Sequence, residues 1–266
     1  MENFDFITEI ARKAVCKVTI SKDSSKGYGF LAWFPLNISG KAIMSGIFST
    51  NQNIRDPQDV QSDNIFFRPD NLNGTATKTV GYTWTNAEID ASFIEISPDK
   101  ALTWQSKGAR FLNIAEVHEG ERILLVGYSK EGKFSVNIGQ IKQIEGSLLK
   151  YIVGSNNGLI SSGAPILNLQ GNVVGIHRAF NENETNEKGF NKESIGVNLK
   201  IALKSLLEGY NKKFAEDEPK RIFFLLIQFL LRLNDNYQLN NLDIMWLQST
   251  CKYSKCSLTY SCQRCT

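Results

Sequence analysis

Residues 158–180 read Gly-Leu-Ile-Ser-Ser-Gly-Ala-Pro-Ile-Leu-Asn-Leu-Gln-Gly-Asn-Val-Val-Gly-Ile-His-Arg-Ala-Phe, and this stretch decides the fold. It joins a Ser-Gly-x-Pro turn to a hairpin of small polar residues and to an apolar strand that ends in Gly-Ile-His. Acyl transfer needs a nucleophilic hydroxyl, a base that takes its proton, and hydrogen-bond donors for the developing oxyanion. The turn offers Ser162 as the nucleophile, with Ser161 as the competitor if the register shifts by one residue.

The overall composition is that of an ordinary globular protein. The chain has 266 residues, of which 42% are hydrophobic and 21% charged. A net charge of +3 without a dense Lys/Arg block gives no reason to expect nucleic acid as a partner. The apolar segment Ile222–Leu233 is shorter than the roughly 18–20 residues that span a bilayer. We therefore expect a buried helix there and no transmembrane segment, with contact to a membrane surface as the alternative.

The N-terminus and the cysteines bear on cellular location. Residues 1–6 are acidic and lack the apolar run of a secretory signal, which predicts a cytoplasmic, reducing setting. Cys16 lies in an expected strand and is predicted to be a core residue. Four cysteines near the C-terminus follow a spacing that suits the common zinc sites poorly, so we predict no metal and no cofactor; they are Cys251, Cys256, Cys262 and Cys265.

Short apolar runs separated by Gly, Asn, Asp and Ser predict an all-β chain of the sandwich or barrel type. The expected strands are residues 15–20, 27–34, 41–48, 65–68, 78–85, 91–96, 122–128, 134–144, 148–153, 164–169, 173–180 and 196–199. Helical spacing is found at residues 4–13 and 201–210. Composition changes after about residue 211, so we set apart a helical, cysteine-rich tail, 211–266. We divide the preceding residues into 1–115 and 116–210.

Taken together, several segments resemble the trypsin-like serine peptidases of the two-barrel chymotrypsin fold, most of all their glutamyl-endopeptidase-like branch. In that family the nucleophile motif reads Gly-x-Ser-Gly-x-Pro, and a Gly-Ile-His strand follows one hairpin later. The further segments that carry the resemblance are residues 27–31 (Gly-Tyr-Gly-Phe-Leu), 88–96, 119–128 and 194–199. It covers most of residues 14–208. It implies two antiparallel β-barrels, with a short N-terminal helix and a helical C-terminal extension.

The same resemblance assigns roles and reveals two departures. It implies Ser162 as nucleophile and Asp90 as the catalytic aspartate, although a surface or capping role is the alternative for Asp90. The family's histidine is expected in a Thr-Asn-x-His-like turn, and our alignment places Phe48 in its position. Phenylalanine cannot accept a proton. The glycine whose N–H joins that of Ser162 in the oxyanion hole is here Ile160, and a β-branched residue adopts unusual backbone angles less readily than glycine.

The chain has two histidines, and neither lies in the first barrel. The resemblance implies that His177 walls the primary specificity pocket and contacts an acidic or amide side chain of a substrate; a buried, hydrogen-bonded histidine is the alternative. His118 is expected to be a solvated loop residue. We therefore expect a peptidase homologue with impaired catalysis that binds a peptide or protein ligand between its barrels. The alternatives are an active serine endopeptidase with Glu/Gln preference that uses Ser162 and Asp90, and a non-catalytic scaffold for partners bound by the tail.

Overall fold

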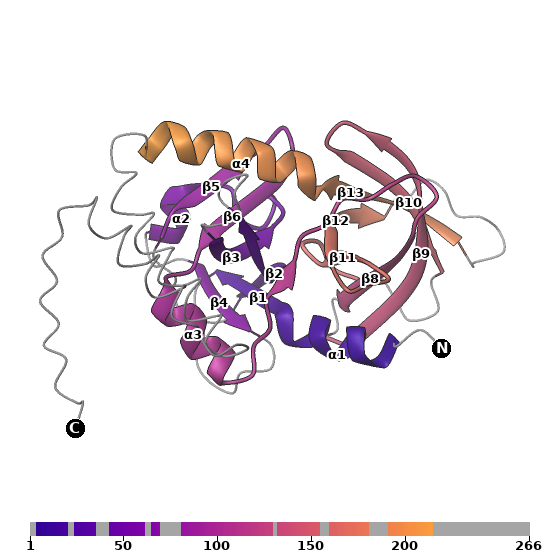
Figure 1. Cartoon of the computed structure of the whole chain (residues 1–266), viewed down its shortest axis with the longest axis horizontal. Helices are drawn as coiled ribbons and strands as arrows, with labels where there is room; N and C mark the ends of the chain where they lie inside the picture. The colour runs from indigo at the N-terminus through magenta and orange to yellow at the C-terminus, as the bar shows by residue number, and fades with distance from the viewer. Residues whose placement is uncertain are drawn as a thin grey trace, which may run out of the picture.

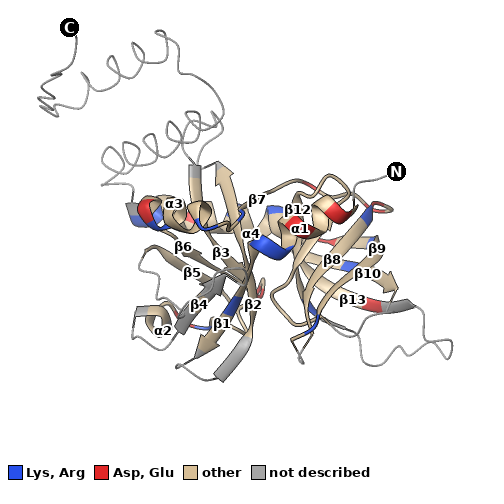
Figure 2. Cartoon of the chain, turned by 90° about the horizontal axis from the view of Figure 1, so that it is seen from below, with Lys and Arg blue, Asp and Glu red and all other residues tan. Residues whose placement is uncertain are grey.

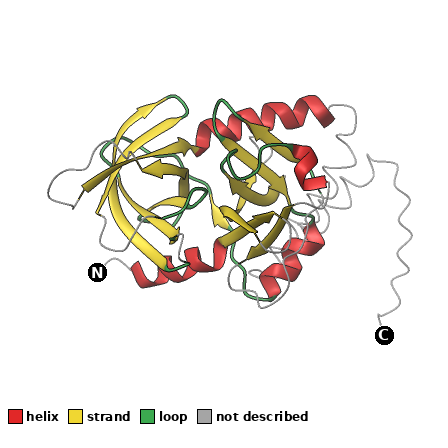
Figure 3. Ribbon diagram, turned by 180° about the vertical axis from the view of Figure 1, so that it is seen from behind, coloured by secondary structure: helices red, strands yellow, loops and turns green. Residues whose placement is uncertain are grey.

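The fold is known from a computed structural model, which describes residues 4–20, 24–35, 43–61, 65–69, 81–129, 132–154, 160–180 and 191–214. Two β-sheets lie side by side, and helices lie on their outer surfaces (Figures 1 and 3). This arrangement confirms the predicted all-β class. The tail beyond residue 214, with its four cysteines and the expected helix Ile222–Leu233, falls outside the described residues.

The first sheet contains seven strands in the order β4-β1-β2-β3-β6-β5, and β7 pairs in parallel with β2. Its strands are β1 (Val15–Ile20), β2 (Ser24–Pro35), β3 (Ile43–Ser49), β4 (Ile65–Pro69), β5 (Thr83–Asn86), β6 (Ala91–Glu95) and β7 (Leu112–Asn113). The central strands bury both faces: every side chain from Gly27 to Phe34 is buried. Cys16 is fully buried in this sheet's core, as predicted.

The second sheet closes on itself as a six-stranded barrel in the order β10-β13-β12-β11-β8-β9. Its strands are β8 (Arg122–Tyr128), β9 (Phe134–Glu145), β10 (Leu148–Gly154), β11 (Pro165–Asn168), β12 (Val173–Phe180) and β13 (Asn191–Asn198). In β10, buried and half-buried residues alternate because neighbouring side chains point to opposite faces of the sheet. The nucleophile stretch therefore becomes β11, its hairpin and β12, on one wall of this barrel.

Four helices are described: α1 (Phe4–Ala14), α2 (Pro57–Gln61), α3 (Pro98–Ser106) and α4 (Leu199–Phe214). The predicted N-terminal and closing helices are thus found as α1 and α4. One large core cluster includes Ala11 of α1, Phe48 of the first sheet, Ile176 of the second and Leu206 of α4. The two halves are therefore packed on a shared core, and α4 runs along both of them (Figure 1).

Charge is mixed on the described part of the chain. Figure 2 shows basic and acidic residues interspersed on α1 and on the strands. On α1, Glu9 and Lys13 form an i,i+4 ion pair of 2.9 Å. Among the described residues, no helix is both long enough and apolar enough to cross a membrane.

Candidate active site

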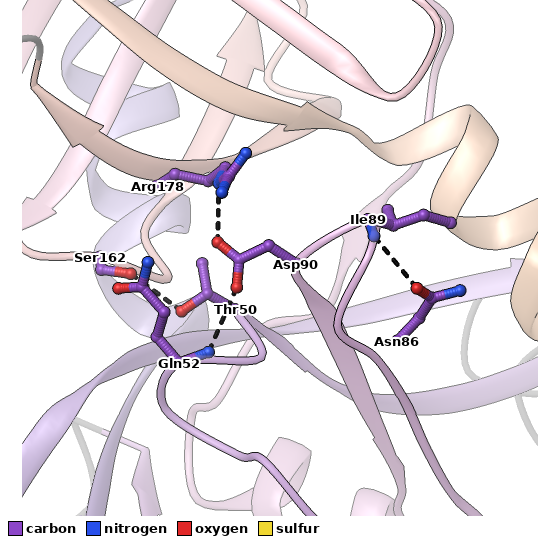
Figure 4. Close-up of polar contacts among 7 residues, drawn as sticks. All are labelled: Thr50, Gln52, Asn86, Ile89, Asp90, Ser162 and Arg178. Carbon is purple, nitrogen blue, oxygen red and sulfur yellow. Dashed lines mark hydrogen bonds and ion pairs between the residues drawn. The ribbon is translucent and has the colours of Figure 1, made fainter.

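The candidate site forms where the two sheets meet, and four segments contribute to it (Figure 4). Ser162 lies in the turn before β11, and Asp90 in the turn before β6. The turn that follows β3 contributes residues 50–53, and β12 contributes Arg178. The fold therefore brings the predicted nucleophile and the predicted aspartate into one region.

The hydroxyl of Ser162 has a second hydroxyl as its partner. Its Oγ lies 2.8 Å from Oγ1 of Thr50. The carbonyl oxygen of Ser162 accepts from the backbone N–H of Tyr28 at 3.2 Å and from Nδ2 of Asn53 at 3.1 Å. The nucleophile turn of the second barrel is therefore hydrogen-bonded to the first sheet on both its side-chain and its backbone atoms.

Asp90 is 4% exposed and has φ of 58°, in the left-handed region that Asp tolerates better than most residues. Its Oδ1 accepts from the backbone N–H of Gln52 at 3.2 Å. Its Oδ2 accepts from Nε of Arg178 at 2.7 Å, and this ion pair joins the first sheet to β12 of the barrel. Each carboxylate oxygen of Asp90 thus accepts a hydrogen bond from a different element.

Phe48, which our alignment placed in the position of the family's histidine, has its side chain in the hydrophobic core. Its side chain is fully buried, with its ring centroid 4.9 Å from that of Phe93 and 5.9 Å from that of Phe30. Phe48 belongs to the inner face of β3, whereas the segment facing Ser162 and Asp90 is the turn just beyond that strand. Residues 50–53 are therefore a second candidate, beside Phe48, for the counterpart of the family's Thr-Asn-x-His turn.

Within the turn, Gln52 is the residue that contacts Asp90. A triad histidine must approach both the serine hydroxyl and the aspartate. Gln52 contacts Asp90 through its backbone N–H, its side chain is exposed, and Figure 4 shows that side chain extending in the direction of Ser162. The sequence signal was the pair Thr50-Asn51, which matches the opening of the expected Thr-Asn-x-His turn.

Counting along that motif would select Asn53 rather than Gln52, but the geometry excludes Asn53. Its side chain is 4% exposed, and its Nδ2 lies within hydrogen-bond distance of the carbonyl oxygens of Tyr28 (3.2 Å) and Ser162 (3.1 Å) and of Ser49 Oγ (3.1 Å). The amide therefore lies beneath the nucleophile turn and binds its backbone.

Ile160 is anchored by its side chain. It is 3% exposed and packs in the core of the closed barrel, against the backbone of Gly127. Among the described non-glycine residues, Asp90 alone has a positive φ, so Ile160 does not adopt the left-handed conformation that glycine takes freely. The direction of the Ile160 N–H is therefore set by a buried side chain.

His177 is fully buried on β12, which corresponds to the buried, hydrogen-bonded alternative. Its Nδ1 lies 2.5 Å from the hydroxyl of Tyr151. Burial lowers the pKa of His177 to about 4, although a hydrogen bond with the backbone of Ile160 acts in the opposite direction. The imidazole is therefore neutral at pH 7, and its Nδ1 contacts the Tyr151 hydroxyl. His118 is exposed, as predicted.

Comparisons with known proteins agree on one family. The family model described as the trypsin-like peptidase domain matches residues 39–176. The glutamyl endopeptidase of Staphylococcus aureus (strain MRSA252) is 27% identical over 139 residues, which cover 50% of this chain and 37% of that protein. This chain therefore matches little more than a third of the length of that curated relative.

Solved structures show the same fold at low sequence identity. The serine endoprotease from Yersinia pestis superposes with a TM-score of 0.53 at 16% identity, covering 77% of this chain and 66% of that one. The active form of the Rv3671c protease from M. tuberculosis gives 0.52 at 11% identity, covering 75% and 82%.

Proposed function

Because the chain belongs to the trypsin-like peptidase domain family, we propose that it is a serine peptidase homologue with impaired catalysis that retains a peptide-binding site between its two β-sheets. Three features support this proposal: the surroundings of the Ser162 hydroxyl, the anchoring of Ile160 and the edge of β12. The proposal depends most on the first feature, the surroundings of the Ser162 hydroxyl.

The observation that carries the proposal is the hydrogen bond between Ser162 Oγ and Thr50 Oγ1. Neither a hydroxyl nor the amide of Gln52 is a base that can take the serine proton near neutral pH. The two histidines are elsewhere: His118 is exposed in the turn before β8, and His177 is buried against Tyr151. In a serine protease of related chemistry, loss of the histidine lowers kcat by about 10⁶.

The oxyanion region adds a second impairment. An oxyanion hole works when its N–H groups are fixed in advance toward the place where negative charge develops. Ile160 has its side chain buried in the barrel and does not take a positive φ. Loss of one such donor lowers kcat by about 10²–10³. Together with a missing base, this makes triad proteolysis inefficient.

Peptide binding would use the edge of β12. β11 pairs with β12 as far as Ile176, and His177 then hydrogen-bonds to the nucleophile turn. Beyond the irregularity at Arg178, Ala179 and Phe180 of β12 pair with β13 on one edge, while no described strand pairs with the other edge. An extended peptide can add to such an edge through main-chain hydrogen bonds. Because His177 is neutral at pH 7, we expect it to contribute no positive charge, so that a Gln side chain binds at least as well as a Glu.

The test of impaired catalysis is labelling by a fluorophosphonate probe, with Ser162→Ala as the blank. In labelling, the Ser162 Oγ–phosphorus bond forms, fluoride leaves, and a base takes the hydroxyl proton. We expect the natural chain to stay unlabelled over hours. Rapid labelling that Ser162→Ala abolishes would overturn the proposal and favour the active Glu/Gln endopeptidase.

A repair experiment tests the base position. The double variant Gln52→His, Ile160→Gly should gain labelling over the natural chain. The matched control, Phe48→His with Ile160→Gly, should gain none, because the imidazole would be buried among Phe30 and Phe93. Equal gains in the two variants would contradict the assignment of Gln52.

The peptide-binding part of the proposal needs its own measurement. Peptides ending in Glu or Gln, titrated into the natural chain by calorimetry, should bind saturably. Absence of saturable binding for any peptide would overturn the peptide-binding site and favour the scaffold alternative.

A further inference from the structure

The Asp90–Arg178 ion pair bears directly on the missing catalysis. The Asp90 side chain is 6% exposed and that of Arg178 is 29% exposed, so the pair is largely withdrawn from water. Charge-assisted hydrogen bonds of this kind are about twice as strong as neutral ones. The two residues are 88 positions apart and come from different sheets, so only the folded chain brings them together.

In a working triad, the aspartate has a defined task. It accepts a hydrogen bond from Nδ1–H of the histidine, fixes the tautomer that leaves Nε2 free for the serine, and stabilises the imidazolium that forms. Here Oδ1 already accepts from the backbone of Gln52 and Oδ2 from Arg178. A histidine at position 52 would have to compete with a guanidinium for the same carboxylate.

We propose that Arg178 is a positioning residue that holds Asp90 in an ion pair and so prevents it from orienting a base at position 52. This inference rests on the proposed function and deepens it, because it adds an obstacle to catalysis at Arg178 to those proposed at Gln52 and Ile160. Restoring the histidine and the oxyanion glycine therefore gives only part of the activity that the fold can support.

The competition favours Arg178 on physical grounds. Arginine stays charged at every relevant pH, whereas an imidazole is charged for only part of the range. A guanidinium close by also disfavours protonation of a neighbouring imidazole. An introduced histidine would therefore find Asp90 engaged and its own charged form destabilised, and both effects act against proton transfer from Ser162.

The test compares Arg178 and Arg178→Ser in the background Gln52→His, Ile160→Gly, using p-nitrophenyl acetate as the acyl donor. Acylation forms the bond between Ser162 Oγ and the acetyl carbon, breaks the ester C–O bond and releases p-nitrophenolate, while the imidazole takes the hydroxyl proton. We expect Arg178→Ser to raise the burst rate by about 10–10³-fold, a part of the roughly 10⁴ attributed to a triad aspartate. The exposed Arg110, replaced by Ser, is the matched control and should change nothing.

Two further readouts separate positioning from a merely structural role. The pH midpoint of acylation should rise by about one unit when Arg178 is replaced, because the freed carboxylate stabilises the imidazolium. Arg178→Ser in the natural chain should lower Tm by on the order of 10 °C, since it leaves Asp90 buried and unpaired. Adding Gln52→His should recover part of that loss, because the imidazole then pairs with Asp90.

The outcomes are decisive in either direction. Labelling of the natural chain by a fluorophosphonate would overturn the proposed function itself. If the natural chain stays inert, an unchanged burst rate and an unchanged pH midpoint on Arg178→Ser would overturn the role of Arg178 alone. Should Arg178→Ser not fold, Arg178→Lys replaces it, since lysine is a point charge without the planar fork. A smaller rate gain and a smaller pH shift are then expected, and no change in either overturns the inference.

Discussion

Gly163 is the position at which a single methyl group tests the packing of the nucleophile turn. Its φ is 91°, and a Cβ atom there would lie 1.7 Å from the carbonyl oxygen of Tyr28 and 2.9 Å from Nδ2 of Asn53. Gly120 is a matched control, because its φ is 80° but a Cβ atom there would have no neighbour within 4 Å. The two alanine variants share the cost of the left-handed backbone and differ in the clash.

The magnitudes follow from this comparison. A left-handed conformation costs an L-residue about 1–2 kcal/mol, and Gly120→Ala should lose only that amount. In Gly163→Ala the Tyr28 peptide must also move, which breaks its hydrogen bond to Ser162 O and disturbs the Asn53 amide. With about 0.5–1.5 kcal/mol for each of these two interactions, the total loss is about 2–5 kcal/mol.

Urea denaturation followed by tryptophan fluorescence measures both losses as changes in the free energy of unfolding. Gly163→Ala should exceed Gly120→Ala by about 1–3 kcal/mol, the sum of the two disturbed hydrogen bonds. Equal losses would refute the reasoning, because they would mean that the nucleophile turn is not in close contact with β2.

The remaining predictions concern buried residues. The pKa of His177 is lowered to about 4, so the unfolded chain binds more protons than the folded chain between about pH 4 and 6.5. The contribution of His177 to the free energy of unfolding is therefore fully present above about pH 6.5. It should fall by about 3 kcal/mol as the pH is lowered to about 4. Thermal melts across this range should lose that component in His177→Gln but keep it in the exposed control His118→Gln. Phe48→Ala should cost about 3–5 kcal/mol in urea unfolding, because it empties a site packed against Phe93; a loss below 1 kcal/mol would contradict a core position. Asn53→Ala should cost about 1–3 kcal/mol in the same assay, since it removes two buried hydrogen bonds, to the carbonyl oxygens of Tyr28 and Ser162, worth about 0.5–1.5 kcal/mol each; an unchanged free energy of unfolding would count against that role.

Some elements were predictable because their signals are local. Residues 122–128 hold the apolar run 123–126 and are preceded by turn residues, and β8 has the predicted limits. α1 follows from the spacing of Phe4, Ile7, Ile10 and Ala11, and Ile7 and Ala11 are buried in the structure. α3 was missed because it buries only Ala101 and Trp104, a stripe too short to show helical periodicity.

The sequence by itself determined the family and the order of the strands, and it predicted a nucleophile turn at Ser162 with a substitution at Ile160, since each signal depends on residues within one short segment. It could not determine which residue stands where a base would be, or what Asp90 contacts. Phe48 and Gln52 lie on opposite sides of the end of β3, and a few residues decide whether a side chain enters the core or faces Ser162. The pairing of Arg178 with Asp90 joins two sheets. Only the packing of one sheet against the other decides such a contact, and this contact makes Asp90 one half of an ion pair.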